Sequence, residues 1–379
     1  MLKVGIVGCG NIADWHASQI QRIKGCQIVG ACDTELLMAQ QLCDRFPIQR
    51  YCDDVKELLR DARPDVVHIT TPPQSHFALA KSCLEAGTHV YVEKPFTLHA
   101  EEAEDLVALA SRRELKLTVG HDDQFSHVAR RMREIVASGY LGGPPIHMES
   151  HFGYDLTSSY ARAVVYDQDH WVRRLPGKLL HNVISHGIAR IAEFLTSDSP
   201  SVVAYAFPSS LLTGLGDTEI VDELRVIIGE EERTTAYFTF SSQMRPSLHQ
   251  FSLYGPKNGL VLNQDHETLI TLRGGRFTSY LEQVVPPVLL AQQHLANVAR
   301  TVWALLTRDF HVKSGMRYLI ESFYRSITNG TPLPIPYAEI LRTARIMDSI
   351  FEQIRADRPQ ADAGFDSRPP ALAGHTVRT

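Results

Sequence analysis

A chain of 379 residues is long for a single hydrophobic core and sufficient for two, since domains mostly contain roughly 100–200 residues. Its composition, 44% hydrophobic and 21% charged, is that of an ordinary globular protein. The formal net charge is −5 and no basic stretch is long enough to follow a phosphate backbone, which argues against a nucleic-acid partner.

The first residues lack the basic region and long apolar run of a signal peptide, and no run approaches the ~20 apolar residues that cross a bilayer. All six cysteines lie between Cys9 and Cys83, and none forms a C-x-x-C pair or a metal-ligand spacing. A disulfide framework is unusual in a chain of this size. We therefore expect a cytoplasmic protein with no metal site and no stable membrane insertion.

Strand-like and helix-like segments alternate over the first 120 residues. The predicted strands are 2–8, 27–32, 65–70, 88–92 and 115–119. The predicted helices between them include 35–46, 55–61, 77–86 and 100–112. This alternation is typical of βαβ units, and strands this apolar require helices on both faces of the sheet. The prediction is a doubly wound parallel α/β domain over residues 1–122.

Longer strands joined by loops rich in Gly, Pro, Asn and Asp follow. They are predicted at 146–153, 202–207, 223–228, 234–241, 250–254 and 268–272, with helix near 180–195. Successive strands after an α/β half indicate an α+β domain, residues 123–355, built on a mostly antiparallel open sheet. The final helix, about 337–355, is expected to pack back on the first domain, and the tail 356–379 to be poorly ordered.

A glycine-rich turn follows the first predicted strand and opens a helix. Gly8 suits a tight turn, Gly10 lets the backbone approach a pyrophosphate, and Ala13 permits close helix–strand packing. The helix N-terminus, at Asn11 and Ile12, offers N–H donors to phosphates. Such a motif is weak alone and gains weight at the start of a βαβ pattern, where it predicts a dinucleotide site.

Asp33 ends the second predicted strand, and it stands 23 residues beyond Gly10. An acid here accepts hydrogen bonds from the ribose hydroxyls and repels a 2′-phosphate, which favours NAD(H) over NADP(H). Residues 34–37 contain no arginine to receive such a phosphate. The alternative role of Asp33 is an N-cap for the next helix. Cys9 is interpreted as a small buried side chain rather than a redox thiol.

Two further segments end strands at the edge where doubly wound sheets bind ligands. One is 70–76, with Thr71, Pro72 and His76, and the other is Glu93-Lys94-Pro95. A lysine beside a positively charged nicotinamide ring has its ammonium form disfavoured and would exchange a proton near neutral pH. The alternative for Glu93-Lys94-Pro95 is a solvated turn.

The order of these motifs, with His16 after the glycine turn, resembles the Gfo/Idh/MocA family of oxidoreductases (glucose-fructose oxidoreductase, inositol dehydrogenase and relatives). Turns at 142–149, 254–259 and 329–334 also resemble the family, so the resemblance covers nearly the whole chain. It implies a Rossmann domain followed by an open-sheet domain. Its implied cofactor is NAD, contacted by Gly8, Gly10, Asn11, Ile12, Ala13, Asp33, Thr71, Pro72, His76, Glu93 and Lys94.

The resemblance also implies a substrate site against the nicotinamide, between Lys94 and a second-domain helix that carries Asn182 and His186. Their i, i+4 spacing puts both side chains on one helix face. The implied roles are proton exchange by His186 and polarisation of the same substrate oxygen by Lys94, with a structural histidine as the alternative. A cis bond before Pro95 is implied as well.

Three departures from the family pattern stand out. Asn182 replaces the aspartate of many members, so it is expected to hydrogen-bond the substrate rather than act as a base. No acid follows His186 at the third position, and the family's Asn-x-Arg-Phe segment is replaced by residues 120–125, which include Asp122. Asp122 is therefore a candidate substrate contact, and the substrate is expected to differ from that of any one family member.

Residues 154–175 are rich in aromatic and polar side chains, including Tyr154 and Trp171. Aromatic faces with hydrogen-bonding groups suit a sugar or cyclitol ring, and an ordinary surface loop is the alternative. Arg173 and Arg174 either face an anionic part of the substrate or lie in solvent.

The helical region 286–313 contains an amphipathic helix, 288–306, with Leu295, Val298, Val302 and Leu305 on one stripe. Packing on the second domain or on another subunit is favoured over attachment to a membrane surface. The open sheet also leaves a face to cover, so a homodimer or homotetramer is expected.

Together these features predict an NAD(H)-dependent oxidoreductase. It would move a hydride between nicotinamide and a hydroxyl or keto carbon of a sugar, cyclitol or sugar derivative. Two other classes stay open: an NAD-dependent glycoside hydrolase or lyase that oxidises its substrate transiently, and a non-catalytic nucleotide-binding sensor. The presence of both Lys94 and His186 argues against the sensor.

Overall fold

The computed structural model describes residues 1–217, 219–231, 233–275, 280–307 and 313–356. Its first sheet has the order β3-β2-β1-β4-β5-β6, and all of its neighbouring strands are parallel. The strands are β1 (Leu2–Val7), β2 (Cys26–Cys32), β3 (Tyr51–Cys52), β4 (Val66–Ile69), β5 (His89–Val92) and β6 (Leu117–Val119). The strand order reverses between β1 and β4, which is the switch point where doubly wound sheets bind ligands. The predicted parallel α/β class is confirmed.

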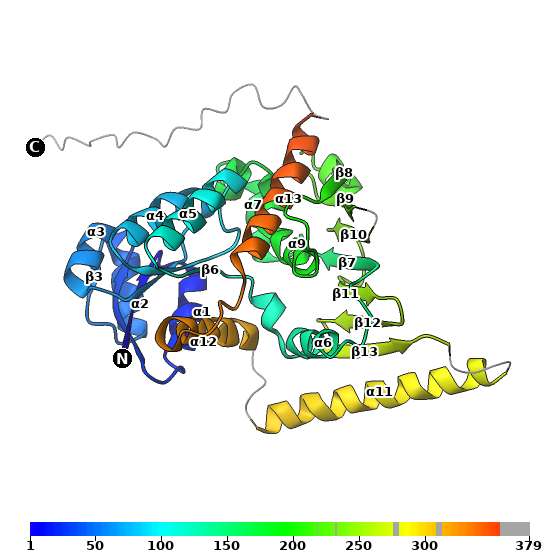
Figure 1. Ribbon diagram of the computed structural model, residues 1–379. Helices are drawn as coiled ribbons and strands as arrows, with labels where there is room; N and C mark the ends of the chain where they lie inside the picture. Colours follow the sequence, from blue (N-terminus) through cyan, green and yellow to red (C-terminus); the bar gives the residue numbers. More distant parts are fainter. Residues whose placement is uncertain (218, 232, 276–279, 308–312, 357–379) are drawn as a thin grey trace, which may run out of the picture.

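Helices cover both faces of this sheet, as the apolar strands require (Figure 1). The helices of the first half are α1 (Asn11–Ile20), α2 (Leu36–Arg45), α3 (Val55–Glu57), α4 (His76–Glu85) and α5 (Ala100–Arg112). Strand β4 is buried along its whole length because α4 and α5 lie on one side of the sheet and α1 on the other. The two-residue strand β3 is too short to show a pattern, and the sequence did not predict it.

The second sheet has the order β13-β12-β11-β7-β10-β9-β8, and its pairs are antiparallel apart from β7 with β10. Its strands are β7 (His147–Gly153), β8 (Ser201–Phe207), β9 (Glu223–Glu230), β10 (Thr234–Ser241), β11 (His249–Tyr254), β12 (Asn258–Asn263) and β13 (Thr268–Arg273). One face packs on α9 (Ser185–Ala192), where a Cβ on Gly187 would lie 2.3 Å from the Phe238 ring. The other face exposes Val203, Tyr205, Ile227 and Tyr237, so this is the predicted open, mostly antiparallel sheet.

The remaining helices frame the second sheet and return to the first domain (Figure 1). They are α6 (His127–Ala137), α7 (Ser159–Tyr166), α8 (Lys178–Val183), α10 (Ser210–Gly214), α11 (Leu281–Leu306), α12 (Ser314–Asn329) and α13 (Tyr337–Ala356). Among the described residues, none of these helices combines the length and apolar character needed to cross a bilayer.

Helix α12 belongs to the core of the first domain, although its residues fall within the range predicted for the second. Met316, Leu319 and Phe323 are buried among the side chains of the first sheet and its helices. An amphipathic pattern shows that one face of a helix is buried, but it does not show which domain covers that face. The predicted boundary at 122/123 therefore leaves α12 out of the first domain, although its side chains belong to that domain's core. The predicted tail lies outside the described residues beyond Ala356.

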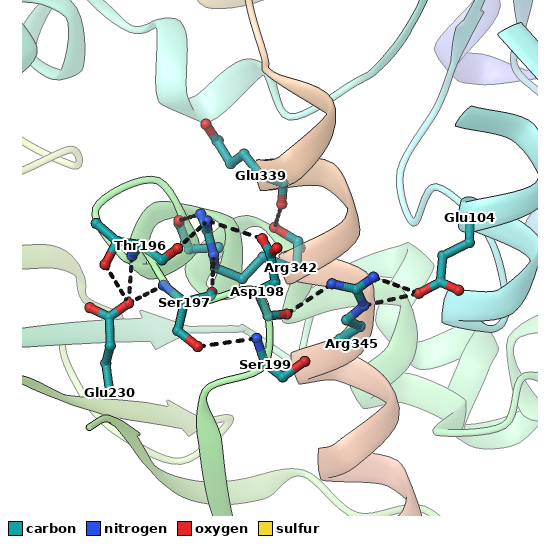
Figure 2. Close-up of polar contacts among 11 residues, drawn as sticks. Glu104, Thr196, Ser197, Asp198, Ser199, Glu230, Glu339, Arg342 and Arg345 are labelled. Atoms are coloured by element: carbon teal, nitrogen blue, oxygen red, sulfur yellow. Dashed lines mark hydrogen bonds and ion pairs between the residues drawn. The ribbon is translucent and has the colours of Figure 1, made fainter. Parts of the chain in front are cut away.

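Helix α13 contacts both domains through polar side chains (Figure 2). The Arg345 guanidinium donates to Glu104 of α5 at 2.7 and 3.0 Å and to the Asp198 carbonyl at 3.0 Å. One turn earlier, Arg342 donates to the Ser197 carbonyl at 2.6 Å. Because these bonds reach a first-domain helix and a second-domain loop from one helix, α13 fixes the two domains relative to each other.

Candidate active site

The glycine turn has the geometry that a phosphate requires. Gly8 has φ +92°, and a Cβ there would lie 2.7 Å from the backbone nitrogen of Thr71. At Gly10 an added Cβ would meet nothing within 4 Å, so the backbone is open to a ligand. Gly10 is also the N-cap of α1 and makes no side-chain cap, which leaves N–H donors at Asn11 and Ile12 for an anion. Ala13 is fully buried at the helix–strand contact, as predicted.

Asp33 holds the glycine turn to the end of β2. Its Oδ2 accepts a hydrogen bond from the Cys9 N–H at 2.7 Å, and its Oδ1 accepts one from the Glu35 N–H at 2.9 Å. Glu35 is the N-cap of α2, so the alternative interpretation of Asp33 as the N-cap is wrong. Burial, with a contribution from the Asp33 charge, raises the pKa of the Cys9 thiol to about 12, and the thiol stays protonated at neutral pH.

His76 joins the two loops at the ends of β4 and β5. Its ring nitrogens lie 2.9 Å from the Thr71 carbonyl and 2.9 Å from the Pro95 carbonyl, and burial lowers its pKa. The Lys94–Pro95 bond is cis, as the family resemblance implied. Thr71 is half-buried and Pro72 exposed at the rim of the site, whereas His76 is buried behind them.

Glu93 is anchored by a buried chain of hydrogen bonds. Its Oε1 lies 2.9 Å from His16 Nε2, while the Nδ1 atoms of His16 and His68 are 2.8 Å apart. His68 Nε2 lies 2.8 Å from the Tyr324 hydroxyl of α12. Burial raises the pKa of Glu93, but His16 and Lys94 outweigh it and the value falls to about 2. The sequence did not single out His68 or Tyr324, because one lies in an apolar strand and the other 256 residues away.

Lys94 reaches across to the second domain. Its Nζ donates to the Asn182 backbone carbonyl at 3.0 Å, and its own N–H donates to Glu93 Oε2 at 3.1 Å. Burial lowers the pKa of the Lys94 ammonium, and the charges of Glu93 and Asp122 oppose that shift in part. A half-buried lysine at a domain junction suits contact with a bound substrate rather than a solvated turn.

The helix expected to carry both Asn182 and His186 is in fact two short helices. Helix α8 ends at Val183 and α9 begins at Ser185, and Ile184 between them keeps right-handed helical dihedrals, so the predicted helix is interrupted at one residue. Asn182 is buried at the end of α8 and His186 lies in the first turn of α9.

His186 stands between an aromatic ring and a carboxylate. Its Nδ1 is buried without a hydrogen-bond partner among the described residues and lies 3.8 Å from Asp123 Oδ2. The ring stacks on Phe152 at 6.3 Å between centroids and lies 6.1 Å from the His121 ring. Burial lowers the pKa of His186, Asp123 opposes the shift and Lys94 adds to it. The charge of Lys94 therefore acts on His186 from across the domain junction.

Two aspartates complete the site. Asp122 is buried with its Oδ2 3.5 Å from Lys313 Nζ, and burial raises its pKa while Lys313 opposes the shift. Asp123 Oδ1 accepts from Gln264 Nε2 at 2.9 Å, and Arg190 Nη2 lies 4.0 Å from Oδ2. Burial acts to raise the pKa of Asp123, but His186 and Arg190 more than offset it.

The sequence prediction missed Asp123, Arg190, Gln264 and Lys313. Asp123 adjoins the predicted Asp122 and shares its position after a strand, so it could have been predicted as a site residue on the same grounds. The other three come from distant segments without such a signal. Ligand atoms of Asp122, Asp123 and His186 lie within 4.8 Å of one another, a spacing that a metal site also uses. Lys313 and Arg190 already supply positive charge beside those carboxylates.

Only some residues of the predicted substrate loop, 154–175, lie where they could contact a substrate. Tyr154 is half-buried just after β7, and burial raises the pKa of its hydroxyl. The Trp171 carbonyl accepts from Gln74 Nε2 at 3.0 Å, which brings this loop to the strand-end segment 70–76. Arg173 is buried and donates to Asp217 at 2.6 Å, so neither alternative predicted for its guanidinium is right.

Comparisons with known proteins agree with this arrangement. Residues 2–121 match the model of the oxidoreductase family with an NAD-binding Rossmann fold. D-glucoside 3-dehydrogenase of Escherichia coli is 32% identical over 142 residues, 37% of this chain and 40% of that protein. UDP-N-acetylglucosamine 3-dehydrogenase of Acidithiobacillus ferrooxidans is 32% identical over 154 residues, 39% of this chain and 44% of that protein. These matches thus span about two fifths of the relatives' length.

The likeness of fold extends through both domains. The WlbA dehydrogenase of Bordetella pertussis, solved in complex with NADH and UDP-GlcNAcA, has a TM-score of 0.74 at 15% identity, covering 94% of this chain and 96% of that one. At this identity the comparison shows the fold alone. Residues 2–121 are thus similar to the NAD-binding Rossmann domain of the Gfo/Idh/MocA oxidoreductase family.

Proposed function

We propose that the chain is an NAD(H)-dependent dehydrogenase or ketoreductase acting on a hydroxyl or keto carbon of a sugar, cyclitol or sugar derivative. The observation that carries the proposal is the position of Lys94. It follows the NAD-binding domain's fifth strand and reaches the Asn182 carbonyl of the second domain at 3.0 Å, and its charge contributes to lowering the pKa of His186. Relatives named as dehydrogenases of a glucoside and of a UDP-sugar support the substrate class.

The cofactor contacts proposed are Gly8, Gly10, Asn11, Ile12, Ala13, Asp33, Thr71, Pro72 and Lys94. His76 and Glu93 act behind this surface, since both are buried and hold the loops that carry it. An ionised carboxylate has about four lone-pair sites, so Asp33 can bind ribose hydroxyls in addition to its two backbone N–H donors. Its charge and the lack of an arginine at 34–37 favour NAD(H) over NADP(H).

In the proposed reaction, Lys94 donates a hydrogen bond to the reacting oxygen of the substrate and polarises it. When bound, the nicotinamide supplies or accepts the hydride. His186 takes the hydroxyl proton in the oxidative direction and returns it in reduction. Burial lowers the pKa of His186, which keeps it neutral and ready to accept. Asp123, 3.8 Å from Nδ1, stabilises the imidazolium that forms.

The substrate contacts proposed are Asp122, Tyr154, Trp171 and Asn182, together with Lys94 and His186. Tyr154 and Trp171 supply aromatic surface for a ring, and Asp122 and Asn182 supply polar groups for its hydroxyls. We also propose a homo-oligomer, because the outer face of the second sheet exposes Val203, Tyr205, Ile227 and Tyr237.

The test is a panel of sugars, cyclitols and nucleotide sugars with NAD⁺ and with NADP⁺, followed by absorbance of the reduced nicotinamide. Turnover with NAD⁺ on one substrate class, lost in Lys94→Ala, supports the proposal. Product release without net reduction of NAD⁺ would instead identify a hydrolase or lyase that recycles its cofactor. Tight nucleotide binding without any turnover across the panel would favour a sensor.

A further inference from the structure

The long helix α11 is held to the rest of the chain along one side. Gln293 bonds to the backbone of Thr271 in β13, accepting at 2.8 Å and donating at 3.0 Å. Asn297, which is buried, donates to the Leu269 carbonyl at 3.1 Å. In Figure 1 the helix runs along the edge of the molecule beyond β13. The side that faces β13 is therefore marked by Gln293 and Asn297.

The opposite side of α11 is apolar and exposed. Leu295 lies two residues from both Gln293 and Asn297, which is about 200° around a helix, and 71% of it is exposed. Exposed apolar residues continue from it in both directions at alternating intervals of four and three. We call this set the α11 seam: Val284, Val288, Ala291, Leu295, Val298, Val302 and Leu305.

The spacing of the seam indicates its partner. Intervals of four and three average 3.5 residues, which is the period of a coiled coil, and the seam spans three heptads, the first of which contains Pro286 and Pro287. Leu289, Trp303 and Leu306 are exposed on α11 as well, so its apolar surface is wider than the seam, and the seam is the part with a regular 3.5-residue spacing. Valine and leucine at this 3.5-residue spacing can pack against a second helix that has the same spacing.

The charges on α11 favour a second copy of the same helix. Its only acidic and basic residues besides His294 are Glu282 and Arg300, which cancel. Each lies two residues from a seam valine, so both project away from the seam. The positions that flank the seam carry Gln292, His294 and Thr301 but no lysine, arginine or carboxylate, and two identical helices can meet without like-charge repulsion. Binding to anionic lipid would require the lysines and arginines that are missing here.

We propose that the α11 seam packs against the α11 seam of a second copy of this chain and forms a subunit interface separate from the outer face of the second sheet. The proposal goes beyond the reaction and does not depend on it, since no residue of the proposed active site lies on α11. Three heptads are a short coiled coil, so association is expected to depend on protein concentration.

The test compares the mass of the full chain in solution, by sedimentation equilibrium over a wide concentration range, for the wild type and for Leu295→Glu and Val298→Glu. A buried carboxylate pair in the seam should halve the mass of the assembly. The matched control is Trp303→Glu, because Trp303 is 69% exposed on the same helix but lies outside the seam. It should keep the wild-type mass. NAD(H) binding and circular dichroism should not change in any variant.

A second variant protects the test against misfolding. Ala291→Leu enlarges a seam position and should shift association of the wild-type assembly to lower protein concentration, without any loss of structure. The proposal is overturned if the wild type is monomeric at every concentration, or if Leu295→Glu retains the wild-type mass while folded. Binding of a monomeric wild type to anionic vesicles, reduced equally by Leu295→Glu and Trp303→Glu, would assign α11 to a lipid surface instead. A loss of NAD(H) turnover would contradict the proposed function and not the proposed α11 interface.

Discussion

The Nδ1 atoms of His16 and His68 lie 2.8 Å apart at the centre of a fully buried chain from Glu93 to Tyr324. Since two nitrogens share one hydrogen, one ring donates and the other accepts. Because the Glu93 carboxylate only accepts, His16 Nε2 donates to it. A single ring hydrogen on His16 then makes its Nδ1 the acceptor from His68 Nδ1–H, and His68 Nε2 accepts from the Tyr324 hydroxyl. This series of hydrogen bonds ties the Glu93-Lys94-Pro95 loop to α12, which returns from the C-terminal part of the chain.

From this series of buried hydrogen bonds we predict that His68 positions Lys94 through Glu93. In His68→Phe the ring stacking with Tyr91 can persist, but His16 and Tyr324 lose a partner in the core. We expect a loss of about 1–3 kcal/mol in the free energy of unfolding, measured in urea. We also expect a lower kcat with little change in KM and a shifted pH profile. Tyr324→Phe, which removes only the end of the chain, should show the same pattern more weakly. An unchanged pH profile in His68→Phe would leave His68 a purely structural role.

Lys94→Ala is predicted to abolish turnover, by roughly 10²–10⁴-fold, and to leave NAD(H) binding nearly intact. The physical reason is the loss of the ammonium that polarises the substrate oxygen, while the glycine turn and Asp33 remain in place. Steady-state kinetics and nucleotide fluorescence titration check the two halves of the prediction. The exposed Lys81 on α4 provides the control, since Lys81→Ala should retain full activity. Full activity in Lys94→Ala would remove this residue from the reaction.

Asp33→Ala should weaken NAD(H) binding far more than NADP(H) binding. A hydrogen bond to a charged acceptor contributes about 1.5–3 kcal/mol, so the NAD(H) dissociation constant should rise roughly 10–100-fold. For NADP(H) the lost repulsion of the 2′-phosphate partly compensates. Because Asp33 also accepts from the Cys9 and Glu35 N–H groups, an equal loss for both nucleotides would mean that it only holds the turn.

Asp123→Asn should move the acidic limb of the kcat/KM profile to lower pH. Asp123 opposes the effect of burial on the pKa of His186, so removing its charge lowers that pKa further. The histidine then stays neutral over a wider range, while the maximal rate falls because the imidazolium is no longer stabilised. Kinetics in the oxidative direction from acid to neutral pH tests both effects. A limb that stays in place would assign the acidic pKa to another group.

Glu339 predicts a pH dependence of stability. Burial, reinforced by Glu193, raises its pKa to about 7, although Gln124, Arg133 and Arg342 oppose the shift. A carboxyl whose pKa is raised on folding binds more protons in the native state, so stability falls as pH rises from 4.5 towards 7. Glu339→Gln keeps an acceptor for Gln124, which donates to Glu339 at 2.7 Å.

The variant Glu339→Gln should therefore be more stable than the wild type above pH 7, by up to about 3 kcal/mol, and similar to it near pH 4.5. Urea unfolding at the two pH values measures the difference. The exposed Glu104 on α5 is a useful comparison, since Glu104→Gln should change stability by much less. Equal stability of the variant and wild type at high pH would contradict the prediction.

Several features of this protein were determined locally and could be predicted from the sequence. Apolar runs and amphipathic stretches predicted the strands of both sheets apart from the short β3 and the strand β12, whose start was interpreted as part of a turn. Gly8, Asp33 and Lys94 each end or follow a strand, and parallel strands bring their carboxyl ends to one edge. That is sufficient to predict an NAD-binding domain and one wall of its site.

The tertiary structure alone decided what surrounds Lys94. Lys313 and Gln264 lie far along the chain from Asp122 and Asp123, and Tyr324 lies farther still from His68, so no local pattern connects them. Helix α12 packs on α1 of the first domain, and no local pattern in its residues identifies that partner. The sequence by itself determined which residues end each strand and which face of each helix is apolar, because these depend on neighbours three or four positions away. Which distant charges meet at the site depends on packing between elements, and only the folded chain decides it.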